Sequence, residues 1–221
     1  MLWIFGDSFS TQWEGMGELG IRYSEYKGYT PKIFSNYLST MLSTDVTQCG
    51  IGGADNHTIF DSIINNIPSM NTDDIVIIGW SHPSRLRVER NNQWVTLCMP
   101  ESGDVPPPNL IPNNQHKFID SNTIQQMLVN RIHPLYWDET IGWSTLLTTL
   151  FQLKGIKVFF WSPFGLCKDI MLKKQLLPND WYIGTPLTRL KFATNGVIND
   201  NHFCEEAHQK LAEILYEKII K

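Results

Sequence analysis

Near its N-terminus the chain reads Trp3-Ile4-Phe5-Gly6-Asp7-Ser8-Phe9-Ser10, a short apolar run that stops abruptly in Gly-Asp-Ser. The run is too short for a helix and turn residues follow it, so it predicts a buried first strand. Ser8 would then lie at the C-terminal end of that strand, the edge at which open α/β sheets bind their ligands. Backbone N–H groups of a following helical turn could stabilise negative charge beside the Ser8 hydroxyl there. The alternative for a lone Gly-Asp-Ser is an ordinary turn after a strand.

The far end of the chain offers a partner for this serine. His202 follows Asp200 by two residues, and a helical pattern starts just after it. An early Gly-Asp-Ser combined with a late Asp/His pair ahead of a closing helix resembles the SGNH or GDSL hydrolase superfamily. The resemblance implies that Ser8 is the nucleophile and His202 the general base.

The third catalytic group is a choice between two neighbours. A serine hydroxyl is a weak nucleophile until a base takes its proton, and the base needs a group that fixes its tautomer. The usual spacing in the superfamily is Asp-x-x-His, and here that position holds Asn199. Some members have the shorter spacing, so Asp200 is the preferred acid, with Asn199 as a neutral partner of His202 as the alternative.

Two further blocks of the superfamily supply the oxyanion hole. The second expected strand ends in the glycine-rich turn 50–56, and the resemblance places Gly53 beside the nucleophile, where its backbone N–H would join that of Ser8. The third block is normally Gly-x-Asn-Asp, but this chain has Gly79-Trp80-Ser81-His82. Ser81 therefore takes the place of the asparagine, and its hydroxyl could donate one hydrogen bond. Similar phage-encoded members also carry a hydroxyl residue there, followed shortly by an arginine, as Arg85 follows here.

Apolar runs alternate with helical patterns along the chain. Further strands are expected at 45–49, 74–79 and 156–161, with a short one near 181–183; helices are expected from Thr30-Pro31 to 42, at 59–67, at 138–154 and from 207 to 219. This order predicts an α/β fold, a three-layer α/β/α sandwich on a flavodoxin-like parallel sheet of about five strands.

Two segments depart from a minimal domain of this kind. Residues 11–29 are polar and rich in glycine, which suggests a loop over the serine. Residues 83–137 form a long insertion after the third strand, with a helix expected at 121–132. We interpret the insertion as a cap beside the serine, and a structural or oligomer-forming extension is the alternative. The whole chain, 1–221, is expected to form a single domain.

Composition limits the classes of partner. The net charge of −4 and the pI near 5.8 argue against general binding to nucleic acid or to anionic membranes. The four cysteines are far apart without a Cys-x-x-Cys pair, and the histidines form no ligand pattern, so we expect free thiols and neither a metal nor another cofactor. No apolar run is long enough to span a membrane, and the chain starts directly with a strand. These features predict a cytoplasmic or virion-associated protein without a signal peptide.

The resulting hypothesis is a serine esterase that removes an acyl group, for example O-acetyl from a carbohydrate, through an acyl-enzyme. Asp7, Asn56, Trp80 and Arg85 are the expected substrate contacts, although a carboxylate at Asp7 also suits the capping of backbone N–H groups. Exposed rings at the sheet edge could stack on sugars, and the candidates are Trp13, Trp80, Trp94, Trp137 and Trp181. The alternative for these rings is core packing. The alternative for the protein is a binding or structural component, such as a virion protein or homo-oligomer, that keeps the fold without the catalysis.

Overall fold

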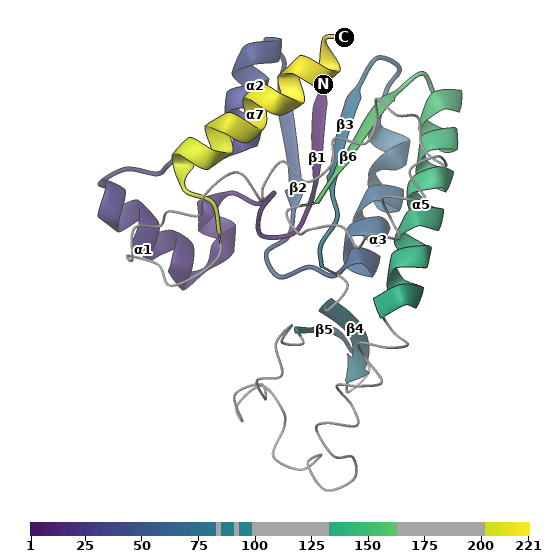
Figure 1. The fold of residues 1–221 in the computed structure, drawn as a ribbon, viewed down its shortest axis with the longest axis horizontal. Helices are drawn as coiled ribbons and strands as arrows, with labels where there is room; N and C mark the ends of the chain where they lie inside the picture. Colours follow the sequence, from purple (N-terminus) through teal and green to yellow (C-terminus); the bar gives the residue numbers. More distant parts are fainter. Residues whose placement is uncertain (83–84, 91–92, 99–132, 163–201) are drawn as a thin grey trace, which may run out of the picture.

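A four-stranded parallel sheet forms the centre of the molecule (Figure 1). The computed structural model describes residues 1–82, 85–90, 93–98, 133–162 and 202–221. The strands are β1 (Leu2–Gly6), β2 (Val46–Gly50), β3 (Ile75–Gly79) and β6 (Lys157–Trp161), in the order β2-β1-β3-β6. Because all four are parallel, their C-terminal ends meet at one edge of the sheet, and Ser8 follows β1 at that edge.

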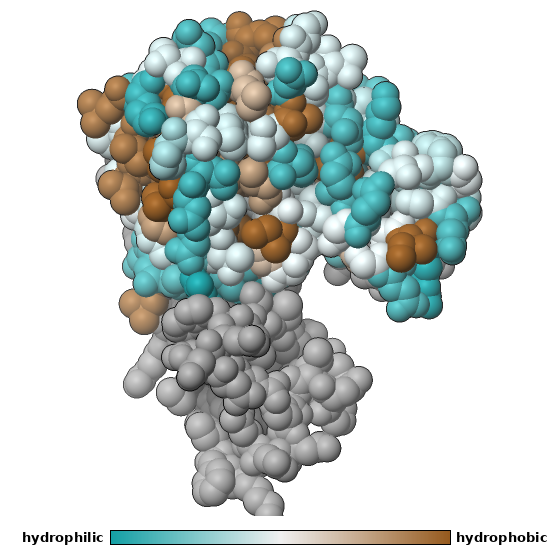
Figure 2. All heavy atoms as spheres, turned by 180° about the vertical axis from the view of Figure 1, so that it is seen from behind, coloured by the Kyte–Doolittle hydropathy of each residue, from teal (hydrophilic) through white to brown (hydrophobic). Residues whose placement is uncertain are grey.

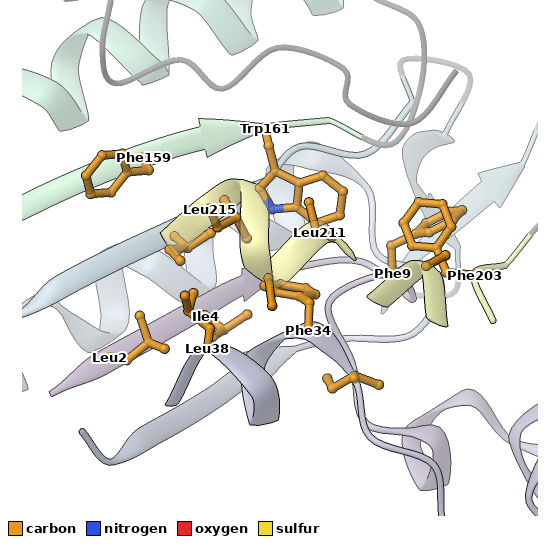
Figure 3. Close-up of a cluster of buried hydrophobic side chains, with 14 of the residues drawn as sticks. Leu2, Ile4, Phe9, Phe34, Leu38, Phe159, Trp161, Phe203, Leu211 and Leu215 are labelled. Atoms are coloured by element: carbon orange, nitrogen blue, oxygen red, sulfur yellow. The ribbon is translucent and has the colours of Figure 1, made fainter. Parts of the chain in front are cut away.

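One face of the sheet packs against the helices α2 (Phe34–Leu42) and α7 (Glu205–Ile219) (Figure 3). Successive side chains of a strand point to opposite faces, so Leu2 and Ile4 of β1 belong to this layer. They meet Leu38 of α2 and Leu215 of α7 in one cluster of buried side chains. Each of these side chains stabilises the fold by about 1.5–3 kcal/mol on burial.

The other face packs against α3 (Asn56–Asn66) and α5 (His133–Leu153). Trp3 and Phe5, the alternate residues of β1, contribute to this second cluster together with Ile63 of α3 and Phe151 of α5. The strands β1, β3 and β6 are apolar on both sides because helices cover both, and β2 is only partly buried. The predicted three-layer α/β arrangement is therefore confirmed.

The strand order is that of a flavodoxin-like sheet through its fourth strand. In such sheets the chain leaves β1 toward β2 on one side and returns to β3 on the other, so the crevice between the ends of β1 and β3 is the usual ligand site. Ser8 follows β1 and Ser81 follows β3, on either side of this switch point. The fifth strand expected near 181–183 lies outside the described residues.

The segment 11–29 is helical, so the prediction of a loop was wrong. It forms the 3₁₀ helix η1 (Trp13–Met16) and the helix α1 (Glu18–Lys27). Trp13 and Tyr23 are buried and pack on each other with ring centroids 4.4 Å apart. Gly20 permits this packing, because a Cβ there would overlap the backbone carbonyl of Trp13. Gly20 therefore serves close approach, whereas Gly28 ends α1 in the left-handed conformation, with φ of 75°.

The predicted helices that the structure describes begin two to five residues away from their expected starts, and α2 and α5 are examples. α2 begins at Phe34 rather than after Thr30, and Asn36 supplies its cap by accepting a hydrogen bond from the Ile33 N–H at 3.0 Å. α5 begins at His133 rather than at Asp138. Helix ends depend on such local hydrogen bonds more than on apolar periodicity.

The described part of the insertion contains an antiparallel pair of strands, β4 (Arg85–Arg90) and β5 (Gln93–Cys98), which lies beyond the C-terminal edge of the main sheet (Figure 1). Arg87 of β4 pairs with Asp61 of α3 and so ties the hairpin to the α3 layer. The helix predicted at 121–132 and most of the proposed cap lie outside the described residues.

Exposed apolar side chains occur on the layer formed by α3 and α5. They are Ile64, Leu135, Leu146 and Leu153. Figure 2 shows hydrophobic residues along the left-hand edge of the molecule, where this layer lies when seen from behind. Within the described ranges, no helix is long and apolar enough to cross a bilayer. Exposed apolar residues of this kind are common on protein surfaces, and they give no functional signal.

Asp74 joins the start of β3 to β1. Its carboxylate accepts hydrogen bonds from the Trp3 indole at 2.9 Å, the Asn71 N–H at 2.9 Å and the Met1 amino group at 3.0 Å. Burial alone would raise the pKa of this carboxyl group, but the three donors together outweigh burial and lower the pKa below its ordinary value.

We expect Asp74→Asn to lower the free energy of unfolding by about 1.5–3 kcal/mol at pH 7, because hydrogen bonds to a charged group are lost. The folded-state pKa is lowered, so the carboxylate contributes its full stability above the unfolded pKa of about 4 and loses it as the pH falls through the folded value. Urea unfolding at pH 7 and pH 3 should therefore show a smaller difference between parent and variant at pH 3. Asp73→Asn, at the exposed neighbour, is the control. An equal difference at both pH values would contradict this account.

Candidate functional site

The structure brings Ser8 and His202 together from opposite ends of the chain. His202 Nε2 lies 2.7 Å from Ser8 Oγ, a hydrogen bond between residues 194 positions apart. Ser8 is in the turn after β1, and His202 lies just before α7. Ser8 is only 7% exposed. This is the contact that a histidine needs in order to take the proton of a serine hydroxyl.

The turn that carries Ser8 rests on a row of glycines. Gly6, Gly50 and Gly79 end the adjacent strands β1, β2 and β3, and they lie side by side in the register of the sheet. A Cβ at Gly79 would come within 2.8 Å of Ser10 Oγ, and one at Gly50 would overlap the Ser10 carbonyl. Only strands that end in glycine let the turn approach this closely.

Aromatic packing holds the His202 ring. Phe9, the residue after the serine, packs on His202 with ring centroids 4.9 Å apart. Phe9 also meets the edge of Phe203 at 4.8 Å, and the two phenylalanines lie next to each other in Figure 3. The segments of Ser8 and His202 are therefore joined by packing as well as by their hydrogen bond.

Asp7 is buried, and its carboxylate is occupied by protein groups. One oxygen accepts a hydrogen bond from the Phe9 N–H at 3.0 Å. The other accepts from the Ser81 hydroxyl at 2.8 Å and from Arg85 at 3.0 Å. Asp7 is only 1% exposed and its carboxylate is satisfied by these groups, so the described contacts do not support its predicted role as a substrate contact. The capping of backbone N–H groups, also predicted for Asp7, is present.

The side chain of Asn56 is likewise hydrogen-bonded within the protein, and these contacts do not support its predicted role as a substrate contact. Its side-chain oxygen accepts from the Ser81 N–H at 2.7 Å, and its nitrogen donates to the Ser81 carbonyl at 3.2 Å and to Thr140 at 3.1 Å. Asn56 thus holds the backbone of Ser81 on both sides. It fixes the position of the segment after β3 relative to α3 and α5.

Trp80 belongs to the core rather than to an exposed surface. It is 3% exposed, stacks with Phe160 at 6.4 Å and donates its indole hydrogen to Ser144 at 2.9 Å. Trp13 is also fully buried. The expectation that these two rings stack on a sugar is therefore wrong, because an aromatic residue beside a strand end can face inward as easily as outward. The side chains of Trp94, Trp137 and Trp181 lie outside the described part of the chain.

Arg85 links the insertion to the turn that carries Ser8. Besides Asp7, it donates to the Ala54 carbonyl at 3.2 Å, and its side chain is 15% exposed. Through these two contacts the start of β4 is held against the turns that follow β1 and β2. A direct contact between Arg85 and substrate stays a prediction.

The candidate oxyanion donors follow the ends of three strands. Gly53 lies after β2 in the left-handed conformation, with φ of 77°, and a Cβ there would meet no atom within 4 Å. The Ile51 N–H donates to the Gly6 carbonyl at 2.9 Å, which joins the turn after β2 to the end of β1. The Ser81 hydroxyl has a single proton, and that proton is directed to Asp7. The Ser81 hydroxyl would have to rotate away from Asp7 in order to donate to an oxyanion.

Of the other polar and titratable groups expected near the site, the structure describes His208 but not Asn199 or Asp200. Asp200 and Asn199 lie outside the described residues, so the choice between them stays open. His208, expected to pack rather than react, is buried on α7 between Trp13 and Phe203, and burial lowers its pKa to about 3 with a smaller contribution from His202. Among the described residues, no group of three His, Cys, Asp or Glu side chains could hold a metal ion.

Several residues that support the site were not predicted from the sequence. The sequence showed a glycine at the end of each of three expected strands. It did not show that all three glycines would lie against Ser10. Glu205, which ties the start of α7 to α2, carried no sequence signal, because a glutamate in the first turn of a helix is common.

No family model matches the chain, and no curated protein matches its sequence. The fold is therefore assigned from the structure alone, as an α/β sandwich with a Ser–His pair at the C-terminal edge of its parallel sheet.

We expect Gly50→Ala to lower the free energy of unfolding by about 1–3 kcal/mol, because the new methyl group must displace the Ser10 backbone. The control is Gly142→Ala on α5, where a Cβ meets nothing and alanine favours the helix by up to about 1 kcal/mol. Urea unfolding of the two variants measures both effects. Equal stability of Gly50→Ala and the parent would show that the turn does not depend on the glycine row.

Proposed function

We propose that this chain is a serine esterase of the SGNH type, with Ser8 as nucleophile and His202 as general base. The observation that carries the proposal is the 2.7 Å contact between Ser8 Oγ and His202 Nε2 at the C-terminal edge of a parallel sheet. Its position beside the β1/β3 switch point supports the proposal, since ligands bind there in sheets of this order. The resemblance in the Gly-Asp-Ser and Asp/His motifs supports it as well.

The proposed reaction has two steps. Ser8 Oγ attacks the ester carbonyl carbon while His202 Nε2 takes the hydroxyl proton, and backbone N–H groups of Ser8 and Gly53 stabilise the oxyanion. The alcohol leaves with the proton from His202, and the acyl group stays on Ser8. Water then attacks the acyl-enzyme with His202 again as base, which releases the acid and restores the serine. In this proposal Asp200 orients His202.

The substrate is proposed only as an acyl ester. The expectation of a carbohydrate rested on exposed aromatic rings, and two of the five candidates, Trp13 and Trp80, are buried. An O-acetyl carbohydrate therefore stays a prediction without support from the described residues.

A second candidate function is a binding or structural protein that keeps the fold without catalysis. The observation in its favour is the Ser81 hydroxyl, which donates to Asp7 instead of pointing its proton toward an oxyanion. Fluorophosphonate labelling separates the two functions, because only an activated serine is modified covalently.

For the esterase we expect covalent labelling at Ser8 and a loss of about 10⁶ in turnover of a short aryl ester in Ser8→Ala. The control is Ser35→Ala, at a buried serine on α2. Mass spectrometry of the labelled protein locates the modified residue, and initial rates give the turnover. An unlabelled parent, or hydrolysis by Ser8→Ala at the parental rate, would reject the esterase.

Ser81→Ala tests the third oxyanion donor. If the Ser81 hydroxyl donates to the oxyanion in the transition state, the variant should lose about 10²–10³ in kcat with little change in KM. Asp7→Asn and the double variant complete a cycle, because Ser81 also donates to Asp7. If the losses in kcat of the two single variants add in the double variant, Ser81 acts directly on the oxyanion. A double variant no slower than Asp7→Asn would show that Ser81 acts only by holding Asp7.

A further inference from the structure

Glu205, the first residue of α7, is bound by donors from three other segments of the chain. Its carboxylate accepts hydrogen bonds from the Tyr29 hydroxyl at 2.6 Å, the Lys32 N–H at 2.9 Å and the Tyr37 hydroxyl at 3.1 Å. The Lys27 ammonium lies 3.8 Å away. A glutamate at a helix start is usually exposed, but the side chain of Glu205 is only 12% exposed. It is therefore built into the fold.

The backbone of the same residue is held as well. The Glu205 N–H donates to the Tyr23 hydroxyl at 3.1 Å. Tyr23 is buried on α1 and packs against Trp13, so its hydroxyl is a fixed point. Residue 205 is thus attached to α1 through its backbone and to α2 and the preceding segment through its side chain.

The carboxylate is charged at neutral pH. Burial would raise the pKa of Glu205, but the donors from Tyr29, Lys32 and Tyr37 together with the Lys27 charge outweigh burial and lower it. On the other side of the contact, burial and the hydrogen bond to Glu205 raise the pKa of Tyr37 to about 12. An ionised carboxylate is an acceptor only, as three converging donors require.

Only Phe203 and Cys204 separate Glu205 from His202. Phe203 is fully buried and packs against Phe9, so this short segment has little freedom once Glu205 is fixed. We infer that Glu205 is a positioning residue that holds His202 against Ser8, an inference that rests on the proposed function for its catalytic consequence. It acts through the start of α7 and does not touch the reacting atoms.

The matched pair of variants is Glu205→Gln and Glu206→Gln. Both remove one negative charge from the first turn of α7, but the side chain of Glu206 is 71% exposed and its ion pair is with Lys27 at 3.0 Å. In Glu205→Gln one carboxylate oxygen becomes an NH₂ group that faces hydrogen-bond donors.

We expect kcat of Glu205→Gln for a short aryl ester, and its rate of fluorophosphonate labelling, to fall about 10- to 100-fold. KM should stay within about twofold, because small misplacements of a catalytic group lower the rate of the chemical step. Glu206→Gln should stay within about twofold of the parent in all three quantities.

A second measurement does not depend on activity. The ring nitrogen signals of His202 in NMR spectra report its hydrogen bond to Ser8 in each variant. We expect this hydrogen bond to be lost in Glu205→Gln and kept in Glu206→Gln. If the parent proves inactive and unlabelled, the proposed function fails, and the His202 signals still decide whether Glu205 positions the ring.

The inference is overturned if Glu205→Gln melts at a lower temperature but keeps the parental kcat, labelling rate and His202 signals, since Glu205 would then only stabilise the fold. Should Glu205→Gln fail to fold, Tyr37→Phe removes one donor and leaves the charge in place. It should lower kcat about two- to fivefold and shift the His202 signals in the same direction. Parental values in Tyr37→Phe would overturn the inference.

Discussion

The site depends on how closely the turn after β1 approaches the ends of the neighbouring strands. Gly6, Gly50 and Gly79 end three adjacent strands in register, and Ser10 occupies the space that their side chains would take. A close-packed interior cannot absorb extra methyl groups without moving its neighbours. The turn is therefore pressed onto the sheet edge. Ser8, two residues before Ser10, is oriented by this packing as well as by its hydrogen bond to His202.

A buried charge joins that turn to the rest of the edge. The Asp7 carboxylate is removed from water, and an unpaired charge there would be costly. Its partners come from separate segments: the N–H of Phe9 in the turn itself, the Ser81 hydroxyl after β3 and Arg85 of β4. Loss of any partner would leave the Asp7 charge poorly compensated. The hairpin and the segment after β3 are therefore tied to the turn that carries Ser8.

The strands β1, β3 and β6 were predictable because each is an apolar run buried on both faces, whereas β2 has fewer apolar residues and is only partly buried. The pairing of Ser8 with His202 was predictable from the resemblance of the Gly-Asp-Ser and Asp/His motifs to those of the SGNH superfamily. The helix α1 was missed because glycines interrupt its pattern, and Trp80 was misplaced because a position beside a strand end does not say which way a ring points. Asn56 was misassigned for a similar reason, since its polar side chain satisfies the backbone of Ser81 instead of a ligand.

No local pattern could set the distance between Ser8 and His202, because 194 positions separate them. That distance is set by α7, which packs against α2 beside the first strand and so returns the C-terminal part of the chain to the edge where the chain began (Figure 1). Closing so long a loop costs conformational entropy, which burial of Leu211 and Leu215 against the sheet and α2 offsets. The contact between Ser8 and His202 therefore requires α2 and α7 to be packed together on the sheet, and a change that loosens α7 from α2 is expected to weaken that contact from a distance.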